Sequence, residues 1–176
     1  AIERESLDGQ DLLFPPELRR AEIQVTAVVH RLAAAAPTLP QIDLDRALPW
    51  TEHENRVTLA PGQADALRRA LSSRAAIITG GPGVGKATML RALLAILRKK
   101  KVACRLLAPT GRAARRLAES SGQEATTIHR ALEPKQGRFQ RHARAPMEGD
   151  FFIVDEASMI DLPLAASLLD ALPHKA

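Results

Sequence analysis

The sequence predicts an α/β fold in which a parallel β-sheet carries helices on both faces, preceded by a short helical segment at the N-terminus. Three observations support this prediction. Short apolar runs, typical of buried strands, alternate with longer stretches whose apolar residues recur at helical spacing. A glycine-rich loop follows the first run, and two acidic residues follow the last. Because strands separated by helices are joined by crossovers, this alternation indicates parallel strands.

Residues 1–37 are expected to form a helical segment ahead of the main domain. After two prolines, apolar side chains recur on one helical face: Leu18, Ala21, Val25, Val28, Val29 and Leu32. Residues 38–58 contain Pro40 and Pro49 without a clear period, and such a stretch is typical of a linker. The remaining residues, 59–176, are expected to form one α/β domain.

Strands and helices alternate within this domain. The expected strands are residues 75–79, 102–108 and 151–154, and the expected helices are residues 61–71, 86–99, 110–120 and 162–172. The second helix has the clearest pattern, because four leucines follow the spacing i, i+3, i+4, i+7: Leu90, Leu93, Leu94 and Leu97. Thr110 is of a residue type that caps helices and is expected to cap the third.

Composition limits the class of protein. The chain has 176 residues, of which 45% are hydrophobic, and this is enough for one core. Its single cysteine, Cys104, excludes an internal disulfide and is expected to be a small core residue. No segment resembles a signal peptide or approaches the roughly 18 apolar residues of a membrane span. We therefore expect a soluble, cytoplasmic protein without a membrane partner.

Positive charge is concentrated in one part of the chain. Residues 98–144 contain 13 Lys or Arg and 3 Asp or Glu, whereas the whole chain has a net charge of only +5. A local basic excess favours a polyanionic partner such as a nucleic acid. The alternative is a basic face that is simply solvated.

The glycine-rich loop, TGGPGVGKAT, nearly matches the phosphate-binding pattern GxxxxGK[ST] and predicts a P-loop NTPase fold. Small residues let backbone N–H groups approach phosphate oxygens, and the following helix adds partial positive charge. Lys86 would reach the β- and γ-phosphates of ATP. The alternative, a chance glycine turn, seldom carries Gly-Lys at a helix start. The nucleotide-binding candidates are Gly80, Gly81, Pro82, Gly83, Val84, Gly85, Lys86, Ala87 and Thr88.

The last expected strand leads directly into Asp155 and Glu156. A carboxylate here would hold Mg²⁺, and its neighbour would orient or deprotonate the attacking water, so both join Lys86 as catalytic candidates. The alternative is that the two acids cap the next helix. Gln63, in the helix before the loop, would bond adenine; the alternative is an exposed glutamine without a ligand.

Four segments together resemble the first motor domain of RecD-like DNA helicases, in helicase superfamily 1. They are ITGGPGVGKATMLRALL, LLAPTGRAARRLAESSG, ATTIHRAL and DFFIVDEASMIDLPL. Their order and spacing match, and the resemblance extends from Leu59 to the end of the chain. The segment PPELRRAEIQVTAVVHRL also resembles the one that precedes the motor in longer members. The resemblance implies a RecA-like fold and ATP-driven movement 5′ to 3′ along single-stranded DNA.

The resemblance also implies roles for individual residues. Gln63 matches the glutamine that reads adenine, and residues 80–87 match the Walker A loop. Asp155 and Glu156 match the Walker B pair. Two further motifs lie on the DNA side in this family, and the matching residues are Pro109, Thr110, Gly111, Arg112, Thr127 and His129, with Arg130 next to them.

The residues by themselves indicate less about the DNA side. The basic side chains supply attraction to phosphates: Arg112, Arg115, Arg116, Arg130, Lys135, Arg138, Arg141 and Arg144. Phe139 is the only aromatic residue among them, so binding is expected to depend on phosphates and on salt. Without the resemblance, His129 would be interpreted as a local hydrogen-bonding residue. A P-loop ATPase without a nucleic-acid role is a further alternative.

Ala87 departs from the family pattern, because it replaces the hydroxyl residue that ligates Mg²⁺. Thr88 is a poor substitute, since one helical step turns a side chain by about 100°. Val84 also replaces a threonine, a change expected to be tolerated. We expect ATP to bind while Mg²⁺ is held weakly and hydrolysis is slow. The alternative is a degenerate module that binds nucleotide and DNA without turnover.

The second RecA-like half of such a helicase, which supplies the arginine finger, has no counterpart in the sequence. The α/β domain is therefore expected to be incomplete and the chain to be an excerpt of a longer protein. By itself the chain is not expected to unwind DNA. Partner subunits of the helicase–nuclease kind are left open.

Overall fold

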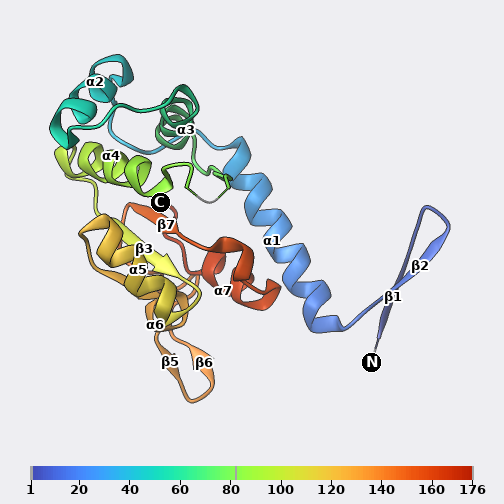
Figure 1. The fold of residues 1–176 in the computed structure, drawn as a ribbon. Helices are drawn as coiled ribbons and strands as arrows, with labels where there is room; N and C mark the ends of the chain where they lie inside the picture. Colours follow the sequence, from blue (N-terminus) through green and yellow to red (C-terminus); the bar gives the residue numbers. More distant parts are fainter. Residues whose placement is uncertain (1, 82, 176) are drawn as a thin grey trace.

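The computed structural model describes residues 2–81 and 83–175, and Figure 1 shows how their helices and strands are arranged. The elements are, in chain order, β1 (Glu3–Leu7), β2 (Gln10–Phe14), α1 (Pro16–Ala34), α2 (Leu44–Asn55), α3 (Pro61–Ser72), α4 (Lys86–Lys99), β3 (Cys104–Ala108), α5 (Gly111–Ser121), β4 (Ala125–Thr127), α6 (Ile128–Ala131), β5 (Pro134–Lys135), β6 (Arg138–Phe139), β7 (Phe151–Val154), the 3₁₀ helix η1 (Ala157–Met159) and α7 (Leu162–Asp170).

Strand β3 is the centre of a three-stranded sheet in the order β4-β3-β7. Both pairings are parallel, and Leu106 of β3 lies opposite Ala125 of β4 and Ile153 of β7. Because the three strands run the same way, their carboxyl ends meet at one edge of the sheet. The α/β class with a parallel sheet, predicted from the sequence, is confirmed.

Helices cover both faces of this sheet, because neighbouring residues of a strand point in opposite directions. Leu106 packs with Leu94 of α4 and Leu117 of α5. The next residue, Leu107, packs with Ile128 of α6 and Leu164 of α7 on the other face.

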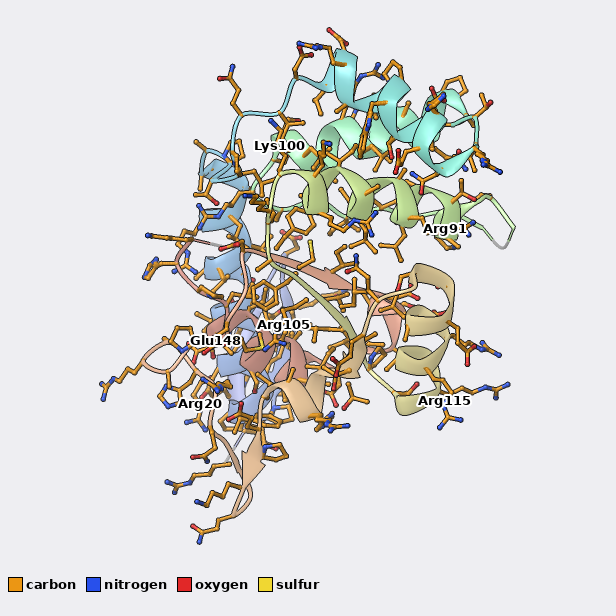
Figure 2. All side chains as sticks on the ribbon, turned by 90° about the vertical axis from the view of Figure 1, so that its left-hand side faces the viewer. Arg20, Arg91, Lys100, Arg105, Arg115 and Glu148 are labelled. Carbon is orange, nitrogen blue, oxygen red and sulfur yellow. The ribbon has the colours of Figure 1, made fainter. Side chains whose placement is uncertain are left out.

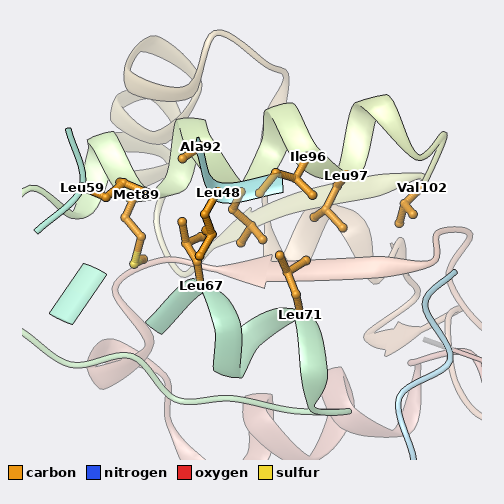
Figure 3. Close-up of a cluster of buried hydrophobic side chains, with 10 residues drawn as sticks. Leu48, Leu59, Leu67, Leu71, Met89, Ala92, Ile96, Leu97 and Val102 are labelled. Carbon is orange, nitrogen blue, oxygen red and sulfur yellow. The ribbon is translucent and has the colours of Figure 1, made fainter. Parts of the chain in front are cut away.

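The largest hydrophobic cluster joins α2 and α3 to α4 (Figure 3). Leu67 of α3 and Leu97 of α4 are fully buried in it, and Leu48 of α2 is nearly so. Burying one such side chain contributes about 1.5–3 kcal/mol. This cluster fixes α3 against α4, and it thereby positions the glycine loop that connects the two helices.

The N-terminal residues form a β-hairpin, so the expectation of a purely helical segment was wrong for β1 and β2. The two strands pair antiparallel around Asp8 and Gly9, both of which have positive φ. An Asp-Gly pair is a strong signal for such a two-residue turn, and it was overlooked in the sequence. Figure 1 shows the hairpin extending away from the rest of the molecule, joined to it through α1.

Helix α2 lies within the stretch expected to be a linker, which is a second correction. The Asp43 side chain caps the helix by accepting from the backbone N–H of Arg46 at 3.2 Å. Pro49 lies inside the helix and removes one backbone N–H. The helix forms nevertheless because Leu48 and Thr51 are buried, and Thr51 donates to the Ala92 carbonyl of α4 at 3.2 Å.

Residues 75–79 do not form the expected strand ahead of the glycine loop. Ile77 is 92% exposed and Ile78 is 37% exposed. An apolar run becomes a strand only where a neighbour accepts its hydrogen bonds, and within the described residues β7 pairs with β3 alone. The segment therefore has no regular secondary structure and is exposed.

The remaining expectations are met within one or two residues. Helix α4 and strand β7 have the expected bounds, and α3, α5 and α7 begin or end within two residues of them. The hairpin of β5 and β6 was not predicted. Within residues 2–81 and 83–175, no helix combines the length and the apolar character that crossing a membrane requires.

Candidate nucleotide-binding site

The glycine loop connects α3 to α4 and ends at Gly85, which precedes the first residue of α4. Gly83 and Gly85 have φ of 76° and 81°, a region that glycine adopts without strain. A Cβ atom on Gly85 would also lie 2.3 Å from Nε2 of Gln63. Position 85 therefore favours glycine because of its conformation, and a side chain there would also have to displace the flexible Gln63 amide. Pro82, another candidate, lies outside the described residues.

Lys86 is the first residue of α4, and its ammonium group folds back over the loop. Its Nζ donates to the Gly80 carbonyl at 2.6 Å and to the Gly81 carbonyl at 3.2 Å. The side chain is exposed. A cation is thus held against the glycine loop that leads into the helix N-terminus, where the helix dipole also favours an anion.

Ala87 and Thr88 follow in the first turn of α4. Ala87 is exposed and offers no ligand atom, whereas Thr88 is half-buried next to the buried Met89. In the described part of the chain no group of three or more His, Cys, Asp or Glu side chains is arranged to hold a metal ion. A divalent cation at this place would therefore need ligands from the nucleotide and from water.

Asp155 and Glu156 lie at the carboxyl end of β7. The Asp155 backbone N–H donates to the Leu107 carbonyl at 3.0 Å, so the hydrogen bonding between β7 and β3 continues as far as Asp155. Its side chain accepts from the Glu156 N–H at 3.0 Å. Glu156 has a φ of 54°, in the left-handed region, and its side chain is exposed.

The alternative role for these two acids, capping the next helix, is not what the structure shows. The cap of α7 is Asp161, whose side chain accepts from the Leu164 N–H at 2.8 Å. No side chain caps η1, the short helix that directly follows Glu156. The Glu156 carboxylate is thus left for a ligand or for solvent.

Gln63 contacts the glycine loop itself, a relationship that the sequence did not reveal. Its Oε1 accepts from the Ala60 N–H at 2.9 Å, and its Nε2 donates to the Val84 carbonyl at 2.8 Å. The two residues joined by the second bond are 21 positions apart. The signal that was available is local: Gln63 is the third residue of α3, a position from which a glutamine can bond the cap residue.

The residues predicted to lie on the DNA side meet at the same edge of the sheet as Asp155. Pro109, Thr110, Gly111 and Arg112 lead from β3 into α5, and Thr127 leads from the neighbouring strand β4 into α6. His129 and Arg130 lie exposed on α6. The His129 ring contacts Phe139 edge-on, with centroids 5.8 Å apart.

Seven of the eight basic side chains named above as attracting phosphates are exposed: Arg112, Arg115, Arg116, Arg130, Lys135, Arg138 and Arg144. The eighth, Arg141, pairs with Glu133 at 2.7 Å, and this hydrogen bond raises the pKa of its guanidinium. Figure 2 shows Arg115 pointing outward from α5. The seven exposed cations form no ion pair with any acid in the described part of the chain.

Cys104, by contrast, is no candidate nucleophile. It is half-buried at the start of β3, and burial, with a smaller effect of Asp150, raises its pKa to about 11. The thiol is therefore neutral at physiological pH. This agrees with its expected role as a small core residue.

Comparison with known proteins agrees with this arrangement. Residues 63–176 match the family described as AAA domain. The chain is 35% identical over 165 residues to the ATP-dependent RecD2 DNA helicase of Deinococcus radiodurans, covering 94% of this chain and 23% of that protein. It is 33% identical to the RecBCD enzyme subunit RecD of Mycolicibacterium smegmatis, covering 92% of this chain and 32% of the relative. It is 37% identical to the same subunit of Haemophilus influenzae, and this match covers 62% of this chain and 21% of that relative.

These relatives are much longer than the chain, which spans between about a fifth and a third of their length. The similarity nevertheless extends over most of the chain, and in two of the three comparisons it covers more than nine tenths of it. The resemblance to RecD-like helicases is confirmed, and the chain belongs to the AAA domain family.

Proposed function

We propose that this chain is the ATP-binding motor domain of a RecD-like, ATP-dependent DNA helicase that acts on single-stranded DNA in repair or recombination. One observation carries the proposal: the Lys86 ammonium is held over the glycine loop at the N-terminus of α4. Backbone N–H groups, a helix dipole and a lysine converge there, and all three favour a phosphate chain. The names of the relatives, an ATP-dependent DNA helicase and RecBCD subunits, support it.

Within this proposal the loop residues Gly80, Gly81, Pro82, Gly83, Val84, Gly85, Lys86, Ala87 and Thr88 bind the phosphates. Lys86 contacts the β- and γ-phosphates, and the exposed Glu156 orients the attacking water. Asp155 is the residue that would hold Mg²⁺. The ion, when bound, neutralises charge on the phosphates.

The site fits Mg²⁺ only together with a nucleotide. Magnesium is commonly held by one or two carboxylates, substrate phosphates and water. Asp155 supplies a carboxylate, but the Ala87 methyl group supplies nothing. We infer that ATP binds through the loop and Lys86, that Mg²⁺ is held weakly, and that hydrolysis is slow in this chain.

Single-stranded DNA is the proposed polymer ligand. Its phosphates would contact the edge of the sheet formed by Pro109, Thr110, Gly111, Arg112, Thr127, His129 and Arg130. The exposed, unpaired cations of α5 support this placement, because phosphate contacts supply most of the affinity of such complexes. A P-loop ATPase without a nucleic-acid role would not need them.

The activity of the whole protein is a separate proposal. The relatives are about three to four times as long as the chain. A second RecA-like half, which would close the nucleotide site, is expected in the full-length protein. Assembly with helicase–nuclease subunits is suggested only by the name of the RecBCD relatives.

An ATP titration of this chain, followed by calorimetry with Mg²⁺ and then with EDTA, tests the proposal. The informative variants are Ala87→Thr, which restores a hydroxyl, and Ala87→Val, which has the same shape without it. We expect ATP to bind in every case, with Mg²⁺ raising the affinity of the threonine variant about tenfold more than that of the valine variant. Failure of ATP to bind with or without Mg²⁺ would contradict the nucleotide site.

A non-hydrolysing nucleotide- and DNA-binding module is the second candidate, and Ala87 is the observation that favours it. Phosphate release by the full-length protein in the presence of single-stranded DNA separates the two. Slow turnover that Ala87→Thr accelerates supports the helicase motor. No turnover in either protein supports the binding module.

A further inference from the structure

Four consecutive cations, residues 98–101, lie at the carboxyl end of α4. Two of them have partners inside the molecule. The Lys99 ammonium lies over the Trp50 ring, 5.7 Å from its centroid. Lys100, labelled in Figure 2, donates to the Gln41 carbonyl at 2.9 Å. These two side chains therefore hold the end of α4 against α2 and the stretch before it.

The other two cations, Arg98 and Lys101, are not used in this way. In the described part of the chain, neither side chain forms a hydrogen bond or an ion pair. Cations near the end of a helix interact favourably with its dipole, but this holds equally for Lys99, which is also in the last turn. The dipole therefore does not explain why two of the four cations have partners and two do not.

Arg98 and Lys101 both line a cavity of about 320 Å³ at the amino end of β3. Its volume is at the lower end of the range for ligand pockets, about 300–1,000 Å³. One wall of the cavity is apolar, because Leu94 and Val102 are buried there and the half-buried Cys104 lies beside them. Charge and apolar surface thus meet at one place.

The remaining polar groups around the cavity also favour an anion. Gln123, from the connection between α5 and β4, lines it with a side-chain amide that has no hydrogen-bond partner among the described residues. Asp150 lies beside the cavity, but its carboxylate accepts from the Ala103 N–H at 2.9 Å and pairs with neither cation. Two positive charges and one amide donor are therefore free to bind a carboxylate.

The cavity lies at the opposite edge of the sheet from the nucleotide and DNA candidates. Cys104 begins β3, whereas Thr110 and Asp155 lie beyond the carboxyl ends of β3 and β7. None of the described residues that line the cavity is aromatic, so a base has no ring on which to stack. A phosphate chain would use the cations but not the apolar wall. A peptide with a carboxylate next to an apolar side chain uses both.

We propose that this cavity is a docking site for an acidic peptide segment of a partner protein. A carboxylate of the peptide binds between Arg98 and Lys101, and a neighbouring apolar side chain packs against Leu94 and Val102. Charge complementarity determines the sign of the partner, and the apolar wall adds the requirement for an apolar residue beside the acid. This inference goes beyond the proposed nucleotide site and does not depend on it.

Fluorescence anisotropy with a labelled hexapeptide, Asp-Asp-Asp-Asp-Leu-Leu with both ends blocked, tests the docking site. The chain should bind this peptide, and replacing both leucines by serine should weaken binding about tenfold, because apolar burial is lost. Arg98→Ala and Lys101→Ala should each weaken binding about threefold. Lys100→Ala is the matched control, since it removes the same charge from a side chain that does not line the cavity, and it should leave the affinity unchanged.

Amide chemical shifts show where the peptide binds. Addition of the peptide should move the signals of Cys104 and Gln123, whereas shifts confined to residues 110–130 would place it on the DNA side and contradict the proposal. Equal binding of the serine peptide would show attraction by charge alone, and an equal loss in Lys100→Ala would exclude the cavity. Displacement of the peptide by oligothymidylate would assign the cavity to nucleic acid instead. ATP affinity should be the same in Arg98→Ala and in the unaltered chain, so the nucleotide site is tested separately.

Discussion

Thr110 and Thr127 have the same local role at the ends of neighbouring strands. The side chain of each accepts a hydrogen bond from the backbone N–H three residues later, that of Ala113 and that of Arg130. The strands β3 and β4 are parallel with Ala108 opposite Thr127, so both capped turns leave the same edge of the sheet. Each hydroxyl still has its own hydrogen to donate. Both threonines are thus suited to shape the backbone and to contact a phosphate.

Substitutions at Thr110 separate these two roles. Thr110→Ala should lower the free energy of unfolding by about 1 kcal/mol, because the α5 cap is lost. Thr110→Asp should keep the cap and the stability, but its charge should weaken binding of single-stranded DNA. Urea denaturation and fluorescence anisotropy measure the two effects. Unaltered DNA affinity in the aspartate variant would place the polymer elsewhere.

The exposed cations of α5 should determine how DNA affinity depends on salt. Arg115→Ala is expected to reduce the slope of log K against log salt by about 0.7, the value for one phosphate contact on a single strand. Arg20→Ala on α1 is a suitable control, since Arg20 is an exposed cation far along the chain from α5 (Figure 2) and its side chain bonds the Pro16 carbonyl of its own helix. Equal slopes for Arg115→Ala and the unaltered chain would exclude α5 from the interface.

Two apolar residues on either side of the α3–loop connection should differ sharply in their contribution to stability. Leu67 is fully buried, and Leu67→Ala should lower the free energy of unfolding by about 2–5 kcal/mol. Ile77 is 92% exposed, and Ile77→Ala should change it by less than about 0.5 kcal/mol. A large loss from Ile77→Ala in chemical denaturation would show that residues 75–79 are packed in solution.

Cys104 should make stability fall at alkaline pH. Its pKa is raised from 9.0 to about 11 in the folded protein, so between these values the unfolded chain binds fewer protons. The stabilising contribution is complete below pH 9 and is lost as the pH rises towards 11. Urea denaturation across this range should show the decline, and Cys104→Ala should flatten it. An equal decline in Cys104→Ala would assign the effect to other groups.

Elements with local signals could be predicted from the sequence. Helix α4 has a leucine repeat and a glycine before it, and β7 is four apolar residues followed by acids. The first hairpin and α2 were missed although their signals, Asp8-Gly9 and Asp43, are present in the sequence. Residues 1–37 were interpreted as one helical segment, and the prolines of residues 38–58 suggested a linker. The prediction of a strand at residues 75–79 was wrong for a different reason. A strand forms only beside a pairing partner, and the pattern of apolar residues does not reveal which partner is present.

The candidate site shows the same division. Lys86 could be named because it directly follows a glycine, and Asp155 and Glu156 because they are the two residues after a strand. The contact between Gln63 and Val84 could not, because it depends on how α3 packs against α4. The meeting of Thr110, Thr127 and Asp155 at one edge follows from strand order, which alternation alone leaves open.

The packing of α1 against α7 has a consequence for how the protein is made. Gln24 of α1 bonds the Ala166 carbonyl of α7, 142 positions away, and Thr38 donates to the Lys175 carbonyl at 2.6 Å. During synthesis α1 leaves the ribosome long before its partner exists. The apolar residues of α1 can be buried against α7 only after residues 162–170 have been synthesised, since contacts between residues so far apart in sequence form late. Helix α1, although it is translated before α7, is therefore expected to be among the last elements to dock.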